Sequence, residues 1–458
     1  MTRLIFTFLF AFLTFANARS QIISTLAGNG TQGYTGDGVL AQYAEFNCPN
    51  NIAVDKQGRV YVADFWNGRI RVVTTDGYVI SVAGNGTDTH SGDGGPATAA
   101  GLNSPVDIAI DKFGNVYIAC DSLTNPSTTS YTYSGSYIRK VDTAGIITTL
   151  AGNGTIGPAG DNGPAANASF YSATGIAVDD TGNVYVSDAA GSVRKINTSG
   201  IITTVAGNNT FGFTGDNGPA TAAQLYGPND VSVDHSGNLF IADFGNNRIR
   251  KVDAMGVIST VAGCDSVAAY GGDNGPATAA HLAWPCGISV DDTGNIYIAD
   301  RANARIRKVN VLGVISTVAG DSVFGYSGDG GLADTAELYN PMGVAIDTLG
   351  NFYIADFGNE DVRMVTAYSA TKVHPLLTHT GELHIWPEPN NGFFSICMSD
   401  NSSQPADFTI IDPTGRIVKT FCSETNKTTQ VHLHVPPGNY IATCIYGDEM
   451  YSRKIVIQ

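Results

Sequence analysis

Six aspartates recur at matching places along this 458-residue chain, each preceded by glycine in a Gly-Asp-x-Gly or closely similar segment. Carboxylates combined with loop carbonyl oxygens can bind calcium, so one interpretation is a calcium site in each loop. The loops lack the dense alternation of acidic and amide residues that is typical of a strong calcium site. The six residues are Asp37, Asp93, Asp161, Asp216, Asp273 and Asp329.

A structural interpretation of the same loops is the stronger one. Three copies continue as Pro-Ala-Thr-Ala-Ala, for example at Pro219–Ala223. Proline suits the first position of a helix and alanine favours the turns that follow. An aspartate just ahead would face the positive end of such a helix. We therefore expect a short capped helix in each loop, braced by the aspartate.

A second set of aspartates ends an apolar segment in most repeats, and an arginine follows a few residues later. Arginine can bind a carboxylate through two hydrogen bonds, so these sets predict Asp–Arg pairs. Repetition in nearly every unit indicates bracing rather than catalysis, because one active site does not need six copies. The aspartates are Asp64, Asp188, Asp243, Asp300 and Asp356, and the expected partners are Arg69, Arg194, Arg248 and Arg305.

Function, if it is localised, should lie where the repeat pattern breaks. The clearest break is an insertion at Asp121–Tyr137, which is rich in Ser, Thr and Tyr. Tyrosine offers rigid contact area with a polar tip, so the insertion predicts a ligand contact, and a tolerated surface insertion is an equal alternative. The candidate ligand-binding residues are Trp66, Tyr131, Tyr133, Tyr137, His281, Trp284 and Arg301.

Metal and thiol chemistry have weaker signals. His90 and His281 belong to opposite repeats of a six-fold ring, and with the loop aspartates they are candidates for an axial metal. The seven cysteines have no metal-ligand spacing. Cys264 and Cys286 bracket one loop and are a candidate disulfide.

The secondary-structure elements that would position these residues can be predicted from a recurring sequence motif. The motif is Ile-Ser/Thr-x-Leu/Val-Ala-Gly, which occurs six times with small variations. Marker aspartates such as Asp55 and Asp111 are 55 to 57 residues apart, except across the insertion, where the spacing is 68. Each unit contains four β-branched segments, which we call strands a to d. Repeats of this length are typical of stacked supersecondary units, and the pattern predicts an all-β fold with a six-bladed β-propeller.

The ends of the repeat array indicate closure. The array begins with a lone strand d at Ile22–Ala27 and ends with an a–b–c unit at Gly343–Val365. We expect the first segment to complete the last sheet, because an open array would expose both edges. Strand direction then places the b–c and d–a connections on one side, which we call the loop face.

Composition limits the partners. The net charge is −16, which argues against nucleic acid and against an anionic membrane surface as binding partners.

Residues 1–20 have the positively charged start, apolar stretch and small residues of a secretory signal peptide. No later segment is long and apolar enough to span a membrane. Residues 367–380 predict a linker, and the short strands of 381–458 predict a small Ig-like β-sandwich.

The repeat unit resembles the NHL repeat, as seen at Pro228–Asp234, Gly237–Asp243 and Asn247–Val252. The resemblance implies a propeller over 21–366 and says little about activity, because such propellers include scaffolds and enzymes.

The tail resembles the C-terminal sorting domain of type IX secretion, through Trp386–Gly392, Asp412–Arg416 and Pro437–Tyr440. Glu388 departs from that pattern, in which asparagine is usual. The resemblance implies a partner in the type IX machinery and a secreted or surface-attached protein on the exterior of a Gram-negative bacterium.

The preferred hypothesis is an exported, non-catalytic scaffold without a cofactor, whose loop face binds a glycan, a protein or a surface polymer. The alternative is a lyase or lactonase of the propeller type with an axial metal.

Overall fold

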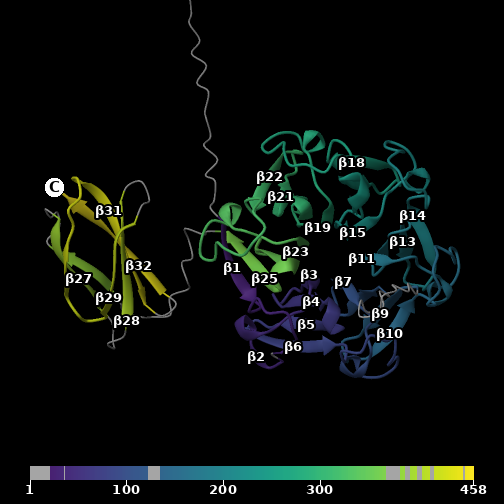
Figure 1. Cartoon of the computed structure of the whole chain (residues 1–458), viewed down its shortest axis with the longest axis horizontal. Helices are drawn as coiled ribbons and strands as arrows, with labels where there is room; N and C mark the ends of the chain where they lie inside the picture. Colours follow the sequence, from purple (N-terminus) through teal and green to yellow (C-terminus); the bar gives the residue numbers. More distant parts are fainter. Residues whose placement is uncertain are drawn as a thin grey trace, which may run out of the picture. The chain divides into compact units, whose positions relative to one another are not determined.

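The computed structural model divides the chain into two compact units, Met1–Tyr368 and Ser369–Gln458 (Figure 1). The structure describes residues 21–35, 37–121, 135–367, 382–386, 392–399, 405–412, 417–446 and 449–458. The expected signal peptide and nearly all of the expected linker lie outside these residues, as do Tyr131 and Tyr133.

The first unit is all-β and contains six antiparallel sheets that follow one another around a ring (Figure 1). The first sheet is β3 (Pro49–Val54), β4 (Val60–Asp64), β5 (Arg69–Val73) and β6 (Tyr78–Ala83), with β2 (Val39–Leu40) at its edge. The second is β7 (Pro105–Ile110), β8 (Val116–Cys120), β9 (Tyr137–Val141) and β10 (Ile147–Ala151). The third is β11 (Ala173–Val178), β12 (Val184–Asp188), β13 (Ser192–Ile196) and β14 (Ile202–Ala206).

The remaining three sheets repeat this order. The fourth is β15 (Pro228–Val233), β16 (Leu239–Asp243), β17 (Arg248–Val252) and β18 (Ile258–Ala262). The fifth is β19 (Pro285–Val290), β20 (Ile296–Asp300), β21 (Arg305–Val309) and β22 (Ile315–Ala319). The sixth is β23 (Pro341–Ile346), β24 (Phe352–Asp356), β25 (Asp361–Ala367) and β1 (Gln21–Ala27).

The N-terminal strand closes the ring, as the sequence predicts. β1 pairs antiparallel with β25, with Ile23 opposite Val365. Each innermost strand contacts the next one, and β23 contacts β3, so the first and last sheets are neighbours. Ile23 is fully buried in a cluster that also contains Val365, so burial of apolar side chains supports the closure.

The connections share faces as strand direction requires. Asn67, in the b–c turn of the first sheet, donates to the carbonyl of Gly33 in the preceding d–a loop at 2.7 Å. Asn246 makes the same bond to Gly212 in the fourth sheet. The d–a loops therefore lie beside the b–c turns, and together they form the loop face.

The helices are shorter than expected. Each d–a loop contains a single 3-10 turn, and in four loops a proline stands just before it without a side-chain cap. The turns of the d–a loops are η1 (Ala41–Tyr43), η3 (Ala97–Ala99), η4 (Ala165–Asn167), η5 (Ala220–Ala222), η7 (Ala277–Ala279) and η9 (Ala333–Thr335). Four b–c turns are also 3-10: η2 (Phe65–Asn67), η6 (Phe244–Asn246), η8 (Arg301–Asn303) and η10 (Phe357–Asn359).

The second unit contains two antiparallel sheets around one core. One sheet has the order β26 (Glu382–Trp386), β27 (Phe393–Ser399) and β30 (Thr429–His432). The other is β29 (Ile417–Glu424), β28 (Pro405–Ile411), β31 (Gly438–Tyr446) and β32 (Glu449–Ile457). Phe394 of the first sheet and Phe408 of the second belong to the same buried cluster, so the sheets pack face to face.

Candidate functional site

The six repeated loop aspartates are held by arginines of strand c. Each arginine side chain is fully buried, whereas the aspartates are 23–47 % exposed. A buried cation requires a paired anion, so these contacts brace each d–a loop against its own sheet. The pairs are Arg71–Asp37 at 2.9 Å and, each at 2.6 Å, Arg139–Asp93, Arg194–Asp161, Arg250–Asp216, Arg307–Asp273 and Arg363–Asp329.

The same arginines also reach the second aspartate set in four sheets, and this corrects the expected pairing. Asp64 binds Arg71, not Arg69, and Asp243 binds Arg250, not Arg248, at 3.3 and 3.2 Å. Arg69 lies directly opposite Asp64, and Arg71, two residues later on β5, points to the same side of the sheet. Only Arg71 also reaches the d–a loop, at Asp37 and at the carbonyl of Thr35. In the fifth and sixth sheets the pairs are Arg307–Asp300 and Arg363–Asp356.

The other expected arginines bind backbone instead. Arg69, Arg248 and Arg305 each donate to two carbonyl oxygens of the loop face, and each stacks over an aromatic ring. Arg194 pairs with Asp161, while Asp188 accepts backbone N–H groups of Tyr171 and Ser172. Both aspartate sets are therefore used to hold the fold.

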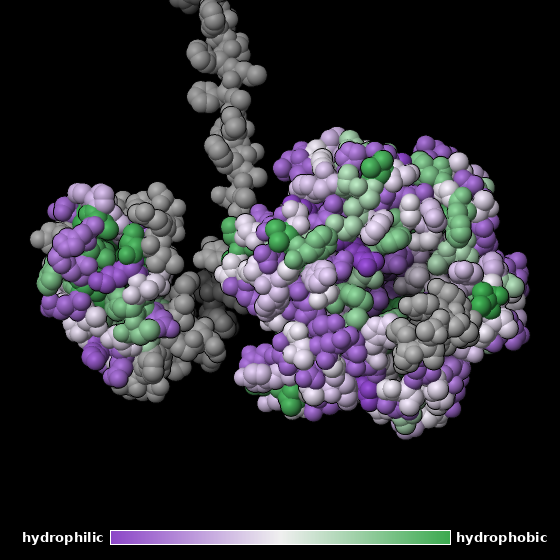
Figure 2. Space-filling model, in the orientation of Figure 1, coloured by the Kyte–Doolittle hydropathy of each residue, from purple (hydrophilic) through white to green (hydrophobic). Residues whose placement is uncertain are grey.

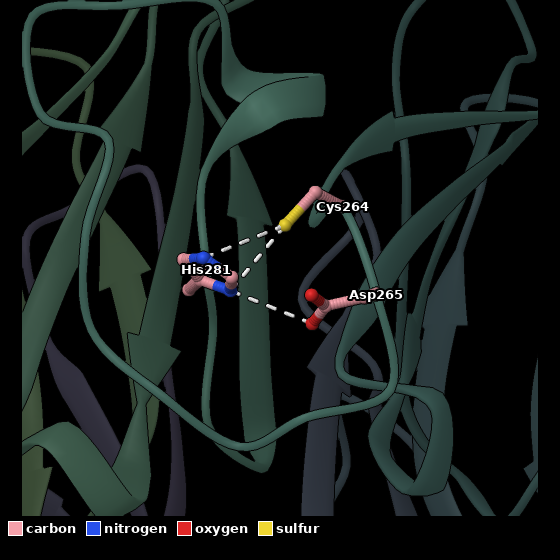
Figure 3. A group of neighbouring side chains, drawn as sticks. All are labelled: Cys264, Asp265 and His281. Atoms are coloured by element: carbon pink, nitrogen blue, oxygen red, sulfur yellow. Dashed lines mark hydrogen bonds and ion pairs between the residues drawn. The ribbon is translucent and has the colours of Figure 1, made fainter.

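The two candidate histidines have separate surroundings. The His90 ring stacks on Tyr137 with centroids 3.6 Å apart, and its Nε2 lies 2.9 Å from the Thr149 hydroxyl. His281 instead lies beside Cys264 and Asp265 in the loop between β18 and β19 (Figure 3). The contacts of His90 and His281 therefore do not support one shared axial metal site.

The expected disulfide is not formed. Cys264 and Cys286 are both free thiols in the structure. The Cys264 sulfur lies 3.3 Å from Nδ1 of His281, whereas the Cys286 thiol donates to the carbonyl of Trp284 at 3.4 Å. Their sequence positions bracket the loop, but Cys286 is buried in β19 and its side chain bonds back to its own loop end. Burial raises the pKa of Cys286 to about 12, and the adjacent Arg301 opposes that rise.

Three exposed aromatic side chains and the partly buried Phe244 gather on the loop face above the fourth and fifth sheets. Phe211 and Tyr226 lie 5.0 Å apart, and Phe244 and Trp284 lie 6.1 Å apart. A Cβ at Gly245 would come within 2.6 Å of the Tyr226 ring, so Tyr226 rests on the residue next to Phe244. We call Phe211, Tyr226, Phe244 and Trp284 the aromatic strip.

The strip is accessible and partly strained. Phe211 is 57 % exposed, and Tyr226 and Trp284 are each 48 % exposed. Trp284 has a φ of +53°, a left-handed conformation that is rare for a large side chain. Its backbone N–H donates to Oδ1 of Asn247 at 2.8 Å, which holds the backbone in this conformation. Trp66 differs, because it is half-buried against Phe65 at 4.5 Å and contributes to the core.

A buried acidic pair on the innermost strands is a feature that our sequence reasoning missed. Asp107 of β7 and Asp230 of β15 interact, and Asn51 of β3 donates to Asp230 at 3.4 Å. Asp107 and Asp230 also accept the N–H groups of Ile176 and Ile288 from neighbouring sheets. These contacts tie five of the six sheets together at the centre of the ring. Burial, and then mutual repulsion, raises the pKa of Asp107 well above its usual range, and burial raises that of Asp230 to about 6.

Comparison of the same position in the six innermost strands could have pointed to this pair. The equivalent position of the other three inner strands is glycine: Gly175, Gly287 and Gly343. A Cβ at Gly175 would come within 2.6 Å of the Asp230 backbone, and one at Gly343 would strike the Asn51 side chain. Three polar side chains and three glycines therefore occupy this position at the centre of the ring. The pattern appears in the sequence only when the six repeats are aligned position by position.

A cavity of about 660 Å³ opens on the side opposite the loop face, between the a–b turns. Its lining includes Lys56, Arg59, Lys112, Phe113 and His235. Its carboxylates are largely used by the turns themselves, as at Asp111, which accepts two backbone N–H groups. His235 bridges Asp180 at 2.7 Å and Asp292 at 3.0 Å, and these hydrogen bonds raise its pKa.

Comparison with known families matches both units. The Teneurin NHL domain model matches residues 154–214, 212–270 and 268–327, and the NHL repeat model matches 46–73. The secretion system C-terminal sorting domain model matches 384–458. Within the described residues, no helix is both long and hydrophobic enough to cross a membrane.

Among curated proteins, human Teneurin-1 is 26 % identical over 397 residues, which cover 78 % of this chain and 14 % of Teneurin-1. Mouse Teneurin-4 is 32 % identical over 244 residues, which cover 48 % of this chain and 8 % of Teneurin-4. The chain thus corresponds to a small part of these relatives.

Solved structures show the same fold. A protein of unknown function from Bacteroides thetaiotaomicron has a TM-score of 0.56 at 20 % identity, covering 76 % of each chain. An auxiliary nutrient binding protein from Bacteroides ovatus has a TM-score of 0.54 at 19 % identity, covering 76 % of this chain and 77 % of its own. The family matches alone show that the chain carries NHL repeats and, at residues 384–458, a secretion system C-terminal sorting domain.

Proposed function

We propose that this protein is an exported six-bladed β-propeller that binds an extracellular oligosaccharide on the aromatic strip without chemically changing it. In this proposal, residues 21–366 are the propeller, 367–380 are a linker, and 381–458 are an Ig-like sandwich used for type IX export. Residues 1–20 act as the signal for the first membrane crossing.

The aromatic strip carries the proposal. Phe211, Tyr226 and Trp284 are about half exposed, and together with Phe244 they continue across two sheets. A rigid aromatic surface costs little conformational entropy on binding and offers both an apolar face and a polar edge. Sugar rings present the matching combination of apolar C–H faces and equatorial hydroxyl groups.

Exposed polar residues adjoin the strip, among them Asn208, Asn209 and Thr210 next to Phe211. Figure 2 shows separate hydrophobic patches set among hydrophilic residues on the face of the first unit that is turned to the viewer. A broad continuous hydrophobic surface would favour a folded protein partner, whereas small patches flanked by polar groups favour a hydroxyl-rich ligand.

The use of the acidic residues supports binding rather than catalysis. General acid–base chemistry needs a carboxyl group within reach of a substrate. The loop aspartates bind buried arginines, and Asp107 and Asp230 are at most 5 % exposed. Two of the structural relatives carry the name auxiliary nutrient binding protein, which agrees with a binding role.

The sorting domain supports the location. A secretion-system sorting domain at residues 384–458 indicates export to the cell surface or the medium. A non-catalytic propeller displayed there would capture or present a nutrient polymer.

The test is a screen of the full chain on an oligosaccharide array, followed by titration calorimetry with a soluble hit. Tyr226→Ala combined with Trp284→Ala should weaken binding at least about 10-fold, as loss of central aromatic contacts does in other interfaces. Phe113→Ala is the matched control, because Phe113 is 71 % exposed and lies on the opposite side. Unchanged affinity of the double variant, or binding only to peptides, would contradict the proposal.

A further inference from the structure

Three side chains with metal-binding atoms converge in the d–a loop between β18 and β19 (Figure 3). They are Cys264, Asp265 and His281, and one ligand atom from each lies within 4.8 Å of the others. The Cys264 sulfur is 3.3 Å from Nδ1 of His281, and the same nitrogen is 3.4 Å from Oδ1 of Asp265. One thiol, one imidazole and one carboxylate therefore face a common point.

This trio is specific to one repeat. At the position of Cys264 four other loops have asparagine, whose amide bonds the loop turn, as Asn85 does to Ala99 at 2.9 Å and to Thr87 at 2.9 Å. At the position of His281 the other loops have Glu45, Gly101, Ser169, Gln224 and Glu337. Cys264 has thus replaced a residue that stabilises the loop, and Asp265 takes over the turn by accepting the N–H of Val267 at 3.1 Å.

The backbone holds the trio in place without using the ligand atoms of Cys264 and His281. The Cys264 N–H donates to Ala280 at 2.9 Å, which brings the thiol next to the neighbouring His281. The Cys264 carbonyl accepts from Arg248 at 3.0 Å, and the His281 carbonyl accepts from Arg307 at 3.3 Å. Both ends of the site are fixed by arginines rooted in the sheets, and a fixed scaffold favours metal affinity.

We propose that Cys264, Asp265 and His281 bind one Zn²⁺ ion through Sγ, a carboxylate oxygen and Nδ1. In a tetrahedral zinc site, bonds of about 2.3 Å to sulfur and about 2.1 Å to nitrogen or oxygen place neighbouring ligand atoms about 3.4–3.6 Å apart. The Nδ1–Oδ1 separation of 3.4 Å in this loop matches that spacing, and the Sγ–Nδ1 separation of 3.3 Å lies slightly below it. Thiolate with imidazole selects zinc over the hard cations calcium and magnesium.

The geometry distinguishes this site from a nucleophilic triad. A Cys–His–Asp triad needs the thiol on one ring nitrogen and the carboxylate on the other, so that the carboxylate orients the base. Here both the thiol and the carboxylate approach Nδ1, and Nε2 is 3.9 Å from the sulfur. Convergence of three donors on one point is the arrangement that a cation uses.

The site is open on one side. The side chains of His281 and Asp265 are 38 % and 45 % exposed on the loop face. With three protein ligands, the fourth position of the zinc would be available to water or to an external donor. This inference does not depend on the aromatic strip, and it places the metal in a loop rather than on the axis of the ring.

The test is zinc binding by the full chain after chelator treatment and dialysis, measured by competition with a chromogenic chelator. About one equivalent of Zn²⁺ should bind, and Co²⁺ in its place should give a thiolate charge-transfer absorption. Cys264→Ala and His281→Ala should each weaken Zn²⁺ binding about 10-fold or more, and Cys264→Ala should abolish that absorption. Circular dichroism verifies that each variant is folded.

Two matched controls and one variant-free measurement complete the test. Cys422→Ala removes an exposed thiol of the second unit, and His235→Ala removes an exposed imidazole that lies between two carboxylates. Both variants should still bind about one equivalent of Zn²⁺ per chain. In the unmodified chain, Zn²⁺ should slow alkylation of Cys264 but not of Cys422, as read by mass spectrometry. Binding that survives Cys264→Ala, or equal alkylation with and without Zn²⁺, would overturn the site.

Discussion

Arg250→Met tests whether the buried arginines hold the ring together. The Arg250 guanidinium is fully buried and binds Asp216 at 2.6 Å and Asp243 at 3.2 Å. Methionine fills much of the volume but removes the charge, which leaves the Asp243 carboxylate buried with only the N–H of Tyr226 and the amide of Asn246 as donors. Breaking a buried ion pair from one side costs about 3–5 kcal/mol, and we expect that loss in the free energy of unfolding near neutral pH.

The loss should depend on pH, and its sign follows from Asp243. Burial already raises the pKa of Asp243, and removal of the arginine removes the positive charge that opposes this rise together with the hydrogen bonds. The carboxyl of the variant therefore takes up a proton more readily, which relieves the buried charge. The deficit relative to the unmodified chain should shrink between about pH 7.5 and about pH 5.

The assay is urea unfolding at both pH values, followed by far-ultraviolet circular dichroism. Arg248→Met is the matched control, since Arg248 lies two residues earlier on β17 but donates to carbonyl oxygens of Asn246 and Cys264 rather than to carboxylates. Its loss should be about 1–2 kcal/mol with little pH dependence. A penalty for Arg250→Met below about 1 kcal/mol, or one that is equal at both pH values, would refute this reasoning.

Three further predictions concern other parts of the fold. His235→Gln should reduce stability only at low pH, because the raised pKa of His235 means that its contribution is present below about pH 6.5 and is lost as the pH rises through the folded-state pKa. Urea unfolding across that range in low and high salt tests this, and the absence of a salt effect would count against the bridge to Asp180 and Asp292. In the unmodified chain the buried Asp230 carboxyl, with its pKa raised to about 6, makes the free energy of unfolding fall as the pH rises from about 4 to about 7, and Asp230→Asn should flatten this fall by up to about 1.4 kcal/mol per pH unit. An unchanged slope in unfolding measured across this pH range would contradict the burial of Asp230 at the centre of the ring. Ile23→Asp should lower the free energy of unfolding by about 2–5 kcal/mol and promote association through the exposed edge of β25, whereas Ser24→Asp, on the opposite side of the same strand, should cost far less. Equal effects of the two variants in calorimetry and light scattering would argue against β1 as the closing strand.

The strands of the first unit were predictable because alternation and turn residues recur in every repeat, and those of the second unit because short apolar segments are separated by turn residues. The pairing of β1 with β25 was also predictable, since the array begins with a strand d and lacks one at its end. The partners of the arginines were not, because Arg69 and Arg71 lie on the same side of β5 and sequence spacing does not show which one lies under the d–a loop.

The candidate sites were harder to predict. Trp284 stood out as a rare residue, but its continuity with Phe244 and Tyr226 depends on loops from different repeats coming together. The contact of His281 with Cys264 and Asp265 was missed because the two parts of one loop, 17 residues apart, meet only after the loop folds back. The pair Asp107 and Asp230 was missed because aspartates in strands have no distinctive local pattern.

The most direct measurement is hydroxyl-radical footprinting of the full chain with and without a bound oligosaccharide. If the aromatic strip is the binding surface, oxidation of Phe211, Tyr226 and Trp284 should fall when the ligand is present, and oxidation of Phe113 should stay the same. Protection of Phe113 with no change at Trp284 would move the binding surface to the cavity on the other side and contradict the account.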